Sequence, residues 1–231
     1  MEIKTKLDRL NPAEYFAVLG ILELTQASLA HFEHEEDTST TFVITSDVAL
    51  PDLKMLPLTA MEHADDKLAP VIVGDLKLDW WLDVWKREKD GLKLWSGNAT
   101  PLIMLQQYQK MMTDVAASEW LQFSRQSKVR SCFGFDTRAT RDALAVGYSQ
   151  NDAKEPCTTY PFTEFLSAIG LQNFRPTGKK IDYYTWSRPI PISIAHAAAV
   201  MEVRGLQQRQ HRITTRGKYT KEIDSVIEVN E

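Results

Sequence analysis

The sequence has few of the features that mark secreted, membrane-spanning or disulfide-stabilised proteins. Its 231 residues include two cysteines, Cys132 and Cys157, too few for a disulfide framework and in keeping with a reducing cytosol. The longest apolar run, residues 195–201, is far shorter than the ~20 residues that a membrane-spanning helix needs. No basic start followed by an apolar stretch opens the chain. We therefore expect a cytoplasmic protein that does not associate with a membrane.

The motifs of common catalytic sites are also missing. The sequence has neither of the phosphate-binding patterns GxxxxGK[ST] and GxGxxG, and none of HExxH, CxxC and GxSxG. His31 and His34 precede two glutamates, which we interpret as a strand end and a solvated turn rather than a metal site. His211 is a candidate general acid or base with no partner evident in the sequence. We predict a non-enzymatic protein that needs no cofactor and no metal.

A net charge of −4 hides an uneven distribution. Residues 1–120 carry 11 Lys and Arg against 20 Asp and Glu, a balance of −9, whereas residues 121–231 carry 16 against 11, a balance of +5. Such asymmetry favours an anionic partner for the basic half. The alternative is that the two halves neutralise each other within one domain or across an oligomer. We predict an acidic half (1–120) and a basic half (121–231) in one compact unit.

The first 45 residues show a clear order of elements. Residues 3–8 alternate apolar and polar side chains, as in a half-buried strand. Asn11 and Pro12 suit the N-cap and first position of a helix, with Glu14 facing its unpaired amides and one apolar stripe along it. Two strands are predicted at 29–33 and 40–45. This order of strand, helix, strand and strand forms half of a ferredoxin-like or RNA-recognition-type layer.

The middle of the chain is less regular. We expect an irregular insertion over 51–70, a strand over 71–81, a helix from 98–101, a basic extended stretch over 121–135 and a short helix over 136–144.

A second helix, after Pro161, resembles the first. Aligning Gly20 with Gly170 pairs residues 15–21 with 165–171. This match predicts an α+β fold in which strand-helix-strand units are duplicated, unless the two helices share only a common composition. Beyond it, the sequence predicts a strand at 181–186, a helix at 192–203, and a terminal hairpin of 207–215 and 219–229 around Arg216-Gly217-Lys218.

The basic half interleaves cations with aromatic residues. Phosphates are contacted by Lys and Arg, and unpaired bases stack on aromatic faces. The alternative is that the aromatic residues form the core and the cations a solvated face. The candidate nucleic-acid-binding residues are Lys128, Arg130, Arg138, Arg141, Tyr148, Lys179, Lys180, Trp186, Arg188, Arg209, Arg212, Arg216 and Lys218.

Four blocks of the sequence resemble small subunits encoded in type I-U (also called I-G) CRISPR operons. The blocks are Asn11-Pro12 through Leu24, Phe135-Asp136-x-Arg138 with Asp142 through Ser149, Pro161 through Pro176, and Trp186 with Pro189-Ile190-Pro191 and the closing Arg216-Gly217-Lys218-Tyr219. Together they span nearly the whole chain in order, while residues 50–120 match no family pattern.

The resemblance implies a subunit of Cascade, the complex that carries a guide RNA and opens matching DNA. The chain looks like a short member of the large-subunit class, which would read the motif beside the target (PAM), hold target DNA and help to recruit the helicase-nuclease. Base pairing with the guide RNA would select the target sequence, while the protein would recognise the shape and backbone of the nucleic acid. Tyr148 or Trp186 would stack at the opening point. The tryptophans of the acidic half, Trp80, Trp81, Trp85 and Trp95, would face other Cascade subunits.

Two alternatives remain at this point. One is a metal-independent ribonuclease that uses His211 to mature guide RNA. The other is a structural bridge between subunits of the same complex that contacts no nucleic acid.

Overall fold

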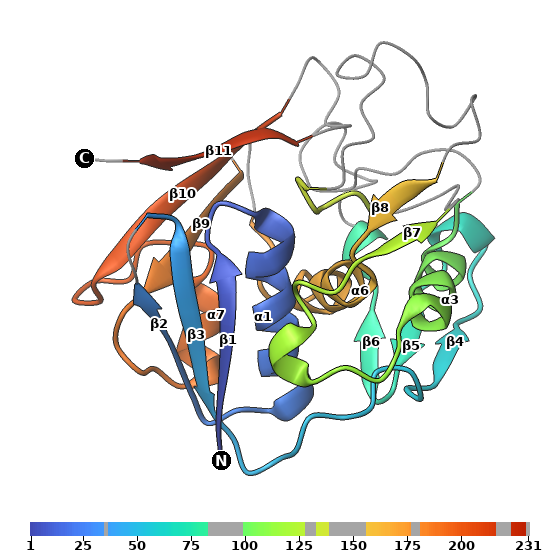
Figure 1. The fold of residues 1–231 in the computed structure, drawn as a ribbon, viewed down its shortest axis with the longest axis horizontal. Coiled ribbons are helices and arrows are strands. Elements are labelled where there is room, and N and C mark those ends of the chain that lie inside the picture. The colour runs from blue at the N-terminus through green and yellow to red at the C-terminus, as the bar shows by residue number, and fades with distance from the viewer. Residues whose placement is uncertain are drawn as a thin grey trace.

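The structure is a computed structural model of the chain. It describes residues 1–34, 37–82, 99–127, 133–138, 156–176, 181–215 and 223–229. The fold is of the α+β class, as the sequence predicts, with several small antiparallel sheets around central helices (Figure 1). None of the described helices is both long and apolar enough to cross a membrane.

The N-terminal unit has the predicted strand-helix-strand-strand order. It comprises β1 (Glu2–Asp8), α1 (Pro12–Thr25), β2 (Leu29–His34) and β3 (Ser39–Thr45), with the sheet order β1-β3-β2. The Asn11 side chain accepts a hydrogen bond from the amide of Ala13, which confirms the predicted cap. Glu14 Oε2 instead accepts from the amide of Asp8 at 2.6 Å, so this carboxylate ties the helix to the end of β1.

The middle of the chain contains more regular structure than the sequence indicates. Over 51–70 it has β4 (Leu58–Ala60) and the 3₁₀ turn η1 (Asp66–Leu68), and beyond them β5 (Val71–Val73), β6 (Leu76–Leu78), the helix α3 (Pro101–Met111) and the 3₁₀ turn η2 (Ala117–Glu119). The single strand predicted over 71–81 is wrong: β5 and β6 form a hairpin, because Gly74 adopts a φ of +58° in a tight turn between them. The predicted start of α3 is confirmed by Thr100, which caps the amide of Ile103.

The basic half supplies the remaining elements. They are β7 (Arg125–Ser127), β8 (Cys157–Thr159), α6 (Pro161–Gly170), β9 (Ile181–Trp186), α7 (Ile192–Ala198), β10 (Gln208–Thr215) and β11 (Ile223–Val229). The predicted terminal hairpin is confirmed, since β10 pairs with both β11 and β9. Helix α7 is shorter than predicted: it ends at Ala198, and the next carbonyl, Ala199 O, accepts from the amide of Tyr184 instead. The short helix predicted over 136–144 lies largely outside the described residues.

Helices α1 and α6 cross at the two glycines that the sequence comparison aligns. A Cβ on Gly20 would lie 2.1 Å from the carbonyl oxygen of Leu166, and a Cβ on Gly170 would lie 2.1 Å from that of Phe16. Phe16 and Leu166 are themselves an aligned pair, so the contact is reciprocal. Neither position can hold a side chain while the backbones lie this close.

The two larger sheets share part of their topology. In each, a helix precedes an antiparallel strand pair whose second strand, β3 or β10, is central in the sheet. The third strand differs: β1 comes before its helix, whereas β11 follows its hairpin. The sheets are joined where Ala30 in β2 bridges Ile190 just beyond β9.

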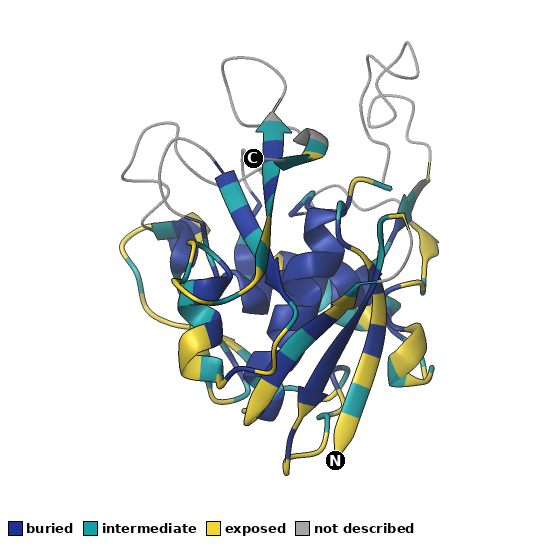
Figure 2. Cartoon of the chain, turned by 90° about the vertical axis from the view of Figure 1, so that its left-hand side faces the viewer, coloured by how far each residue is buried: buried dark blue, intermediate teal, exposed yellow. Residues whose placement is uncertain are grey.

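The core surrounds these helices. Figure 2 shows α1 and α6 buried along their lengths, with strands in front that alternate between buried and exposed residues. Helix α1 was predicted to have one apolar stripe, but it is buried on nearly every side because sheet and α6 cover opposite faces. The buried cluster contains residues from both the acidic and the basic halves.

Candidate nucleic-acid interface

The face of the β9-β10-β11 sheet that turns away from the core carries polar side chains from β9 and β10 beside Ile227 and Val229 from β11. Pairing places Asp182 opposite Arg212 and Tyr184 opposite Gln210, and all four are partly exposed. Residues of the other face, such as Tyr183 and His211, are fully buried. Alternation along the strands therefore separates a core face from a face that a ligand could reach.

Arg212 is held on this outer face by a two-pronged contact. Its Nε lies 2.6 Å from Asp182 Oδ1 and its Nη2 lies 2.9 Å from Oδ2, and the bonds to this carboxylate raise the pKa of Arg212. Gln210 Nε2 donates to the same carboxylate at 2.8 Å. This predicted phosphate ligand is fixed in place, and part of its hydrogen-bonding capacity is used within the sheet.

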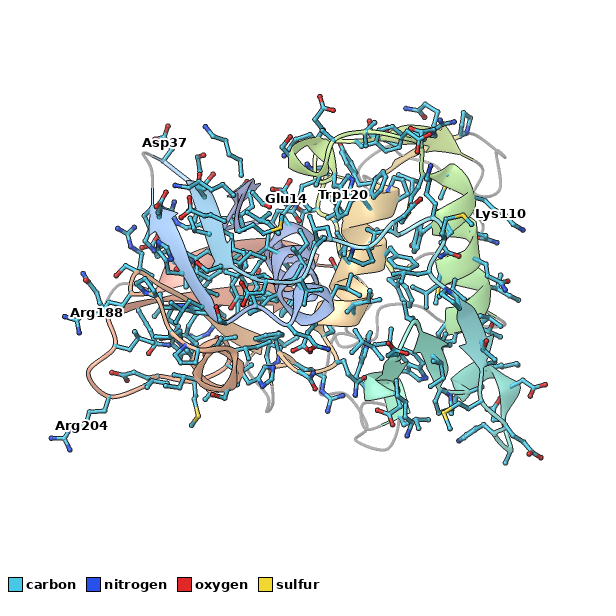
Figure 3. All side chains as sticks on the ribbon, turned by 90° about the horizontal axis from the view of Figure 1, so that it is seen from below. Glu14, Asp37, Lys110, Trp120, Arg188 and Arg204 are labelled. Atoms are coloured by element: carbon cyan, nitrogen blue, oxygen red, sulfur yellow. The ribbon has the colours of Figure 1, made fainter. Side chains whose placement is uncertain are left out.

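Three more arginines lie at the end of the sheet where β9 finishes and β10 begins. Arg188 follows β9, Arg204 precedes β10 and Arg209 lies within it, and all three are exposed. Ser187 and Gln207, which adjoin these segments, are joined by a backbone and a side-chain hydrogen bond. Figure 3 shows Arg188 and Arg204 extending from the same end of the molecule, opposite Lys110. Among the described residues, Arg188 and Arg204 form no ion pair, while Arg209 lies 3.5 Å from Glu228. We call Arg188, Arg204 and Arg209 the arginine group.

Arg138 is held by contacts within the molecule. Its guanidinium bonds Glu14 and Asp136, at 2.5 and 2.6 Å, and donates to the carbonyl of Leu121. It also lies 3.7 Å from the centre of the Tyr160 ring. Burial raises the pKa of Glu14, and Arg138 opposes that shift. With these internal partners, Arg138 stabilises the buried ends of the two central helices, and its contact with nucleic acid stays a prediction.

The stacking role predicted for Trp186 is wrong, because Trp186 belongs to the core. It is 0% exposed, its indole Nε1 donates to Ala30 O at 2.8 Å, and its ring meets Phe32 edge-on. Trp80 and Trp81 are buried in the same way, with indole bonds to Ala168 O and Leu68 O. Neither of these two can form the predicted protein-facing surface.

His211, the candidate ribonuclease residue, is 0% exposed and stacks on Tyr183. Burial lowers its pKa to about 4, so the ring is neutral near pH 7. Its Nε2 lies 3.2 Å from Thr185 Oγ1, which in turn contacts His34 Nε2 at 3.4 Å. An RNA strand cannot reach this ring in the observed fold.

His31 and His34 lie in β2, as the sequence indicates. In the part of the chain that the structure describes, no group of three or more His, Cys, Asp or Glu side chains could hold a metal ion.

The other predicted binding and interface residues lie outside the described part of the chain. They are Lys128, Arg130, Arg141, Tyr148, Lys179, Lys180, Arg216, Lys218, Trp85 and Trp95.

No protein-family model, curated protein or solved structure matches this chain.

Sequence reasoning missed Arg204, Glu202 and Gln210. Gln210 carries no charge, and the other two lie in a segment predicted to be partly helical. For Gln210, the sequence does contain a usable pattern. Side chains alternate between the two faces along 208–213, which pairs with 181–186, and this alternation assigns Gln210 to the outer face once the register is known.

Proposed function

We propose that this chain is a non-catalytic, nucleic-acid-binding subunit of an RNA-guided type I CRISPR effector complex, Cascade. In that complex it would hold target DNA beside the PAM, together with guide RNA, and support recruitment of the helicase-nuclease. The observation that carries the proposal is the arginine group at one end of the β9-β10-β11 sheet.

Exposed arginines at one end of a sheet favour contacts with phosphates. Each guanidinium presents several donors in a plane, and neutralising a phosphate releases bound counterions. Arg188 and Arg204 have no carboxylate partner among the described residues, so a phosphate would not have to displace one.

The resemblance to type I-U subunits supports the choice of complex. The two blocks with the longest matched runs correspond to α1 and α6, whose close crossing organises the core. The fourth block begins with Trp186 and Pro189, on either side of Arg188. One of the blocks that suggest the family therefore flanks Arg188, a member of the arginine group.

The test uses the effector assembled from the operon's own subunits and guide RNA. Affinity for a duplex carrying target and PAM is measured by gel shift at several salt concentrations, with the wild-type chain and with Arg188→Glu/Arg204→Glu. We expect at least ten-fold weaker binding and a salt slope reduced by about 2 for the double variant.

The matched control reverses two exposed lysines elsewhere on the molecule, Lys67→Glu/Lys110→Glu, and should bind as the wild type does. If the double variant assembles normally and binds DNA with unchanged affinity, the chain is a structural bridge and the proposal is wrong. A chain that fails to copurify with the complex would contradict it as well.

A further inference from the structure

A groove of about 320 Å³ lies against the outer face of the β9-β10-β11 sheet. Tyr184, Gln210 and Val229 contribute from three adjacent strands, and Glu202 and Leu206 from the segment between α7 and β10. Arg209 and Glu228 also line it, and they form an ion pair with each other. The segment that carries Glu202 and Leu206 also carries Arg204, so the groove adjoins one of the cations proposed to bind phosphates.

The wall of this groove is fixed to the sheet. Gln208 Nε2 donates to the carbonyls of Ala198 and Met201, at 2.7 and 3.0 Å, and its Oε1 accepts from the amide of Val203 at 2.6 Å. Gly205, with φ of +81°, turns the chain back towards β10. One side chain therefore binds three points of the segment, and the groove is formed before any ligand arrives.

Apart from Arg209, which pairs with Glu228, the groove presents acceptors that a ligand could use. Glu202 is exposed and has no ion-pair partner among the described residues. Gln210 uses its Nε2 on Asp182, so its Oε1 remains to accept, and no described residue donates to it. Tyr184, Leu206 and Val229 add aromatic and apolar surface. A flat ring with hydrogen-bond donors along one edge matches this lining.

We propose that the groove binds one unpaired guanine of a single strand. The base would pack against Tyr184 and direct its N1–H and N2 amino group to Glu202 and Gln210 Oε1, while neighbouring phosphates contact the arginine group. Guanine is favoured because its pairing edge carries two adjacent donors, whereas the other bases present fewer donors there. This inference rests on the proposed function and adds the base that the surface recognises.

The experiment measures binding of the full-length chain to fluorescein-labelled 12-mers by anisotropy. The probes are oligo-dT with one central guanine, the same strand with hypoxanthine, which lacks the N2 amino group, and oligo-U with one guanine. We expect guanine to bind about ten-fold more tightly than hypoxanthine, and the DNA and RNA strands to show whether displaced DNA or guide RNA is the better ligand.

Two variants test the assignment. Glu202→Gln should remove the preference for guanine, whereas the exposed control Glu119→Gln should keep it. Tyr184→Leu should weaken binding of every strand about ten-fold without changing the melting temperature.

The inference is overturned if guanine and hypoxanthine bind equally, if Glu202→Gln keeps the preference, or if no strand binds to the full chain. The proposed function is judged separately, by the DNA affinity of the assembled complex. If charge reversal weakens the complex but Glu202→Gln leaves guanine discrimination intact, only the guanine site is wrong.

Discussion

His211 is a histidine that the fold keeps neutral. It contacts Thr185 on one side, and no described residue pairs with its Nδ1, which is buried. Two buried nitrogens of the nearby Arg9 guanidinium, Nε and Nη1, have no partner among the described residues. Adding a proton to His211 would place a second positive charge in this buried site, which Glu228 offsets only in part.

We predict that this arrangement makes stability depend on pH. The folded pKa of His211 is about 4 and its ordinary value is 6.5, so between these values the unfolded chain binds the proton and the folded chain does not. The contribution is complete above about pH 6.5 and is lost as pH falls towards 4, by up to ~3 kcal/mol. Urea denaturation at pH 7.5 and 4.5 measures it.

The variant His211→Phe should lose less stability than the wild type over this pH range, since phenylalanine can stack on Tyr183 but cannot titrate. His63→Gln, in the connection between β4 and β5, serves as the control and should keep the wild-type dependence. Equal pH dependence in His211→Phe and the wild type would contradict the assignment.

At the scale of elements, the crossing of α1 and α6 leaves no room for a side chain. We predict that Gly20→Ala and Gly170→Ala each lower the free energy of unfolding by about 2 kcal/mol. The expected cost of forcing the backbones apart, about 3 kcal/mol, exceeds the roughly 1 kcal/mol that alanine gains in a helix. Denaturant unfolding of the single variants measures each loss.

The double variant separates this explanation from two independent effects. Once one alanine has forced the helices apart, the second should cost less, so the losses should add to less than their sum. Gly205→Ala is the control: no atom lies within 4 Å of its Cβ position, so it should show only the strain of its positive φ. Strict additivity would mean that the two glycines do not share one contact.

Local elements could largely be predicted from the sequence, because their signals lie close together along the chain. Asn11 and Pro12 indicate the start of α1, and alternation predicts β1 and the terminal hairpin. The side chains that face outward could not be predicted in the same way. The internal contacts of Arg138 with Glu14 and of Trp186 with Ala30 join residues more than 100 positions apart, so no local pattern indicates them.

At the scale of the whole molecule, the acidic and basic halves meet in one core. Helix α1, from the first half, is buried against α6, from the second. We predict that residues 121–231 expressed alone lack a cooperative thermal transition, because α6 then exposes the surface that α1 covers. Adding residues 1–120 should restore the transition, as followed by circular dichroism. A cooperative melt of the isolated 121–231 fragment would contradict this dependence.

The glycine crossing also has a consequence for how the chain is made. Helix α1 is synthesised long before its partner α6, which ends at Gly170. Until that residue has left the ribosome, a helix that is apolar on nearly all sides has nothing to cover one of its faces. Contacts between such distant segments form slowly, and an uncovered apolar helix is prone to aggregate in the meantime. The nascent chain should therefore depend on chaperones until α6 has emerged.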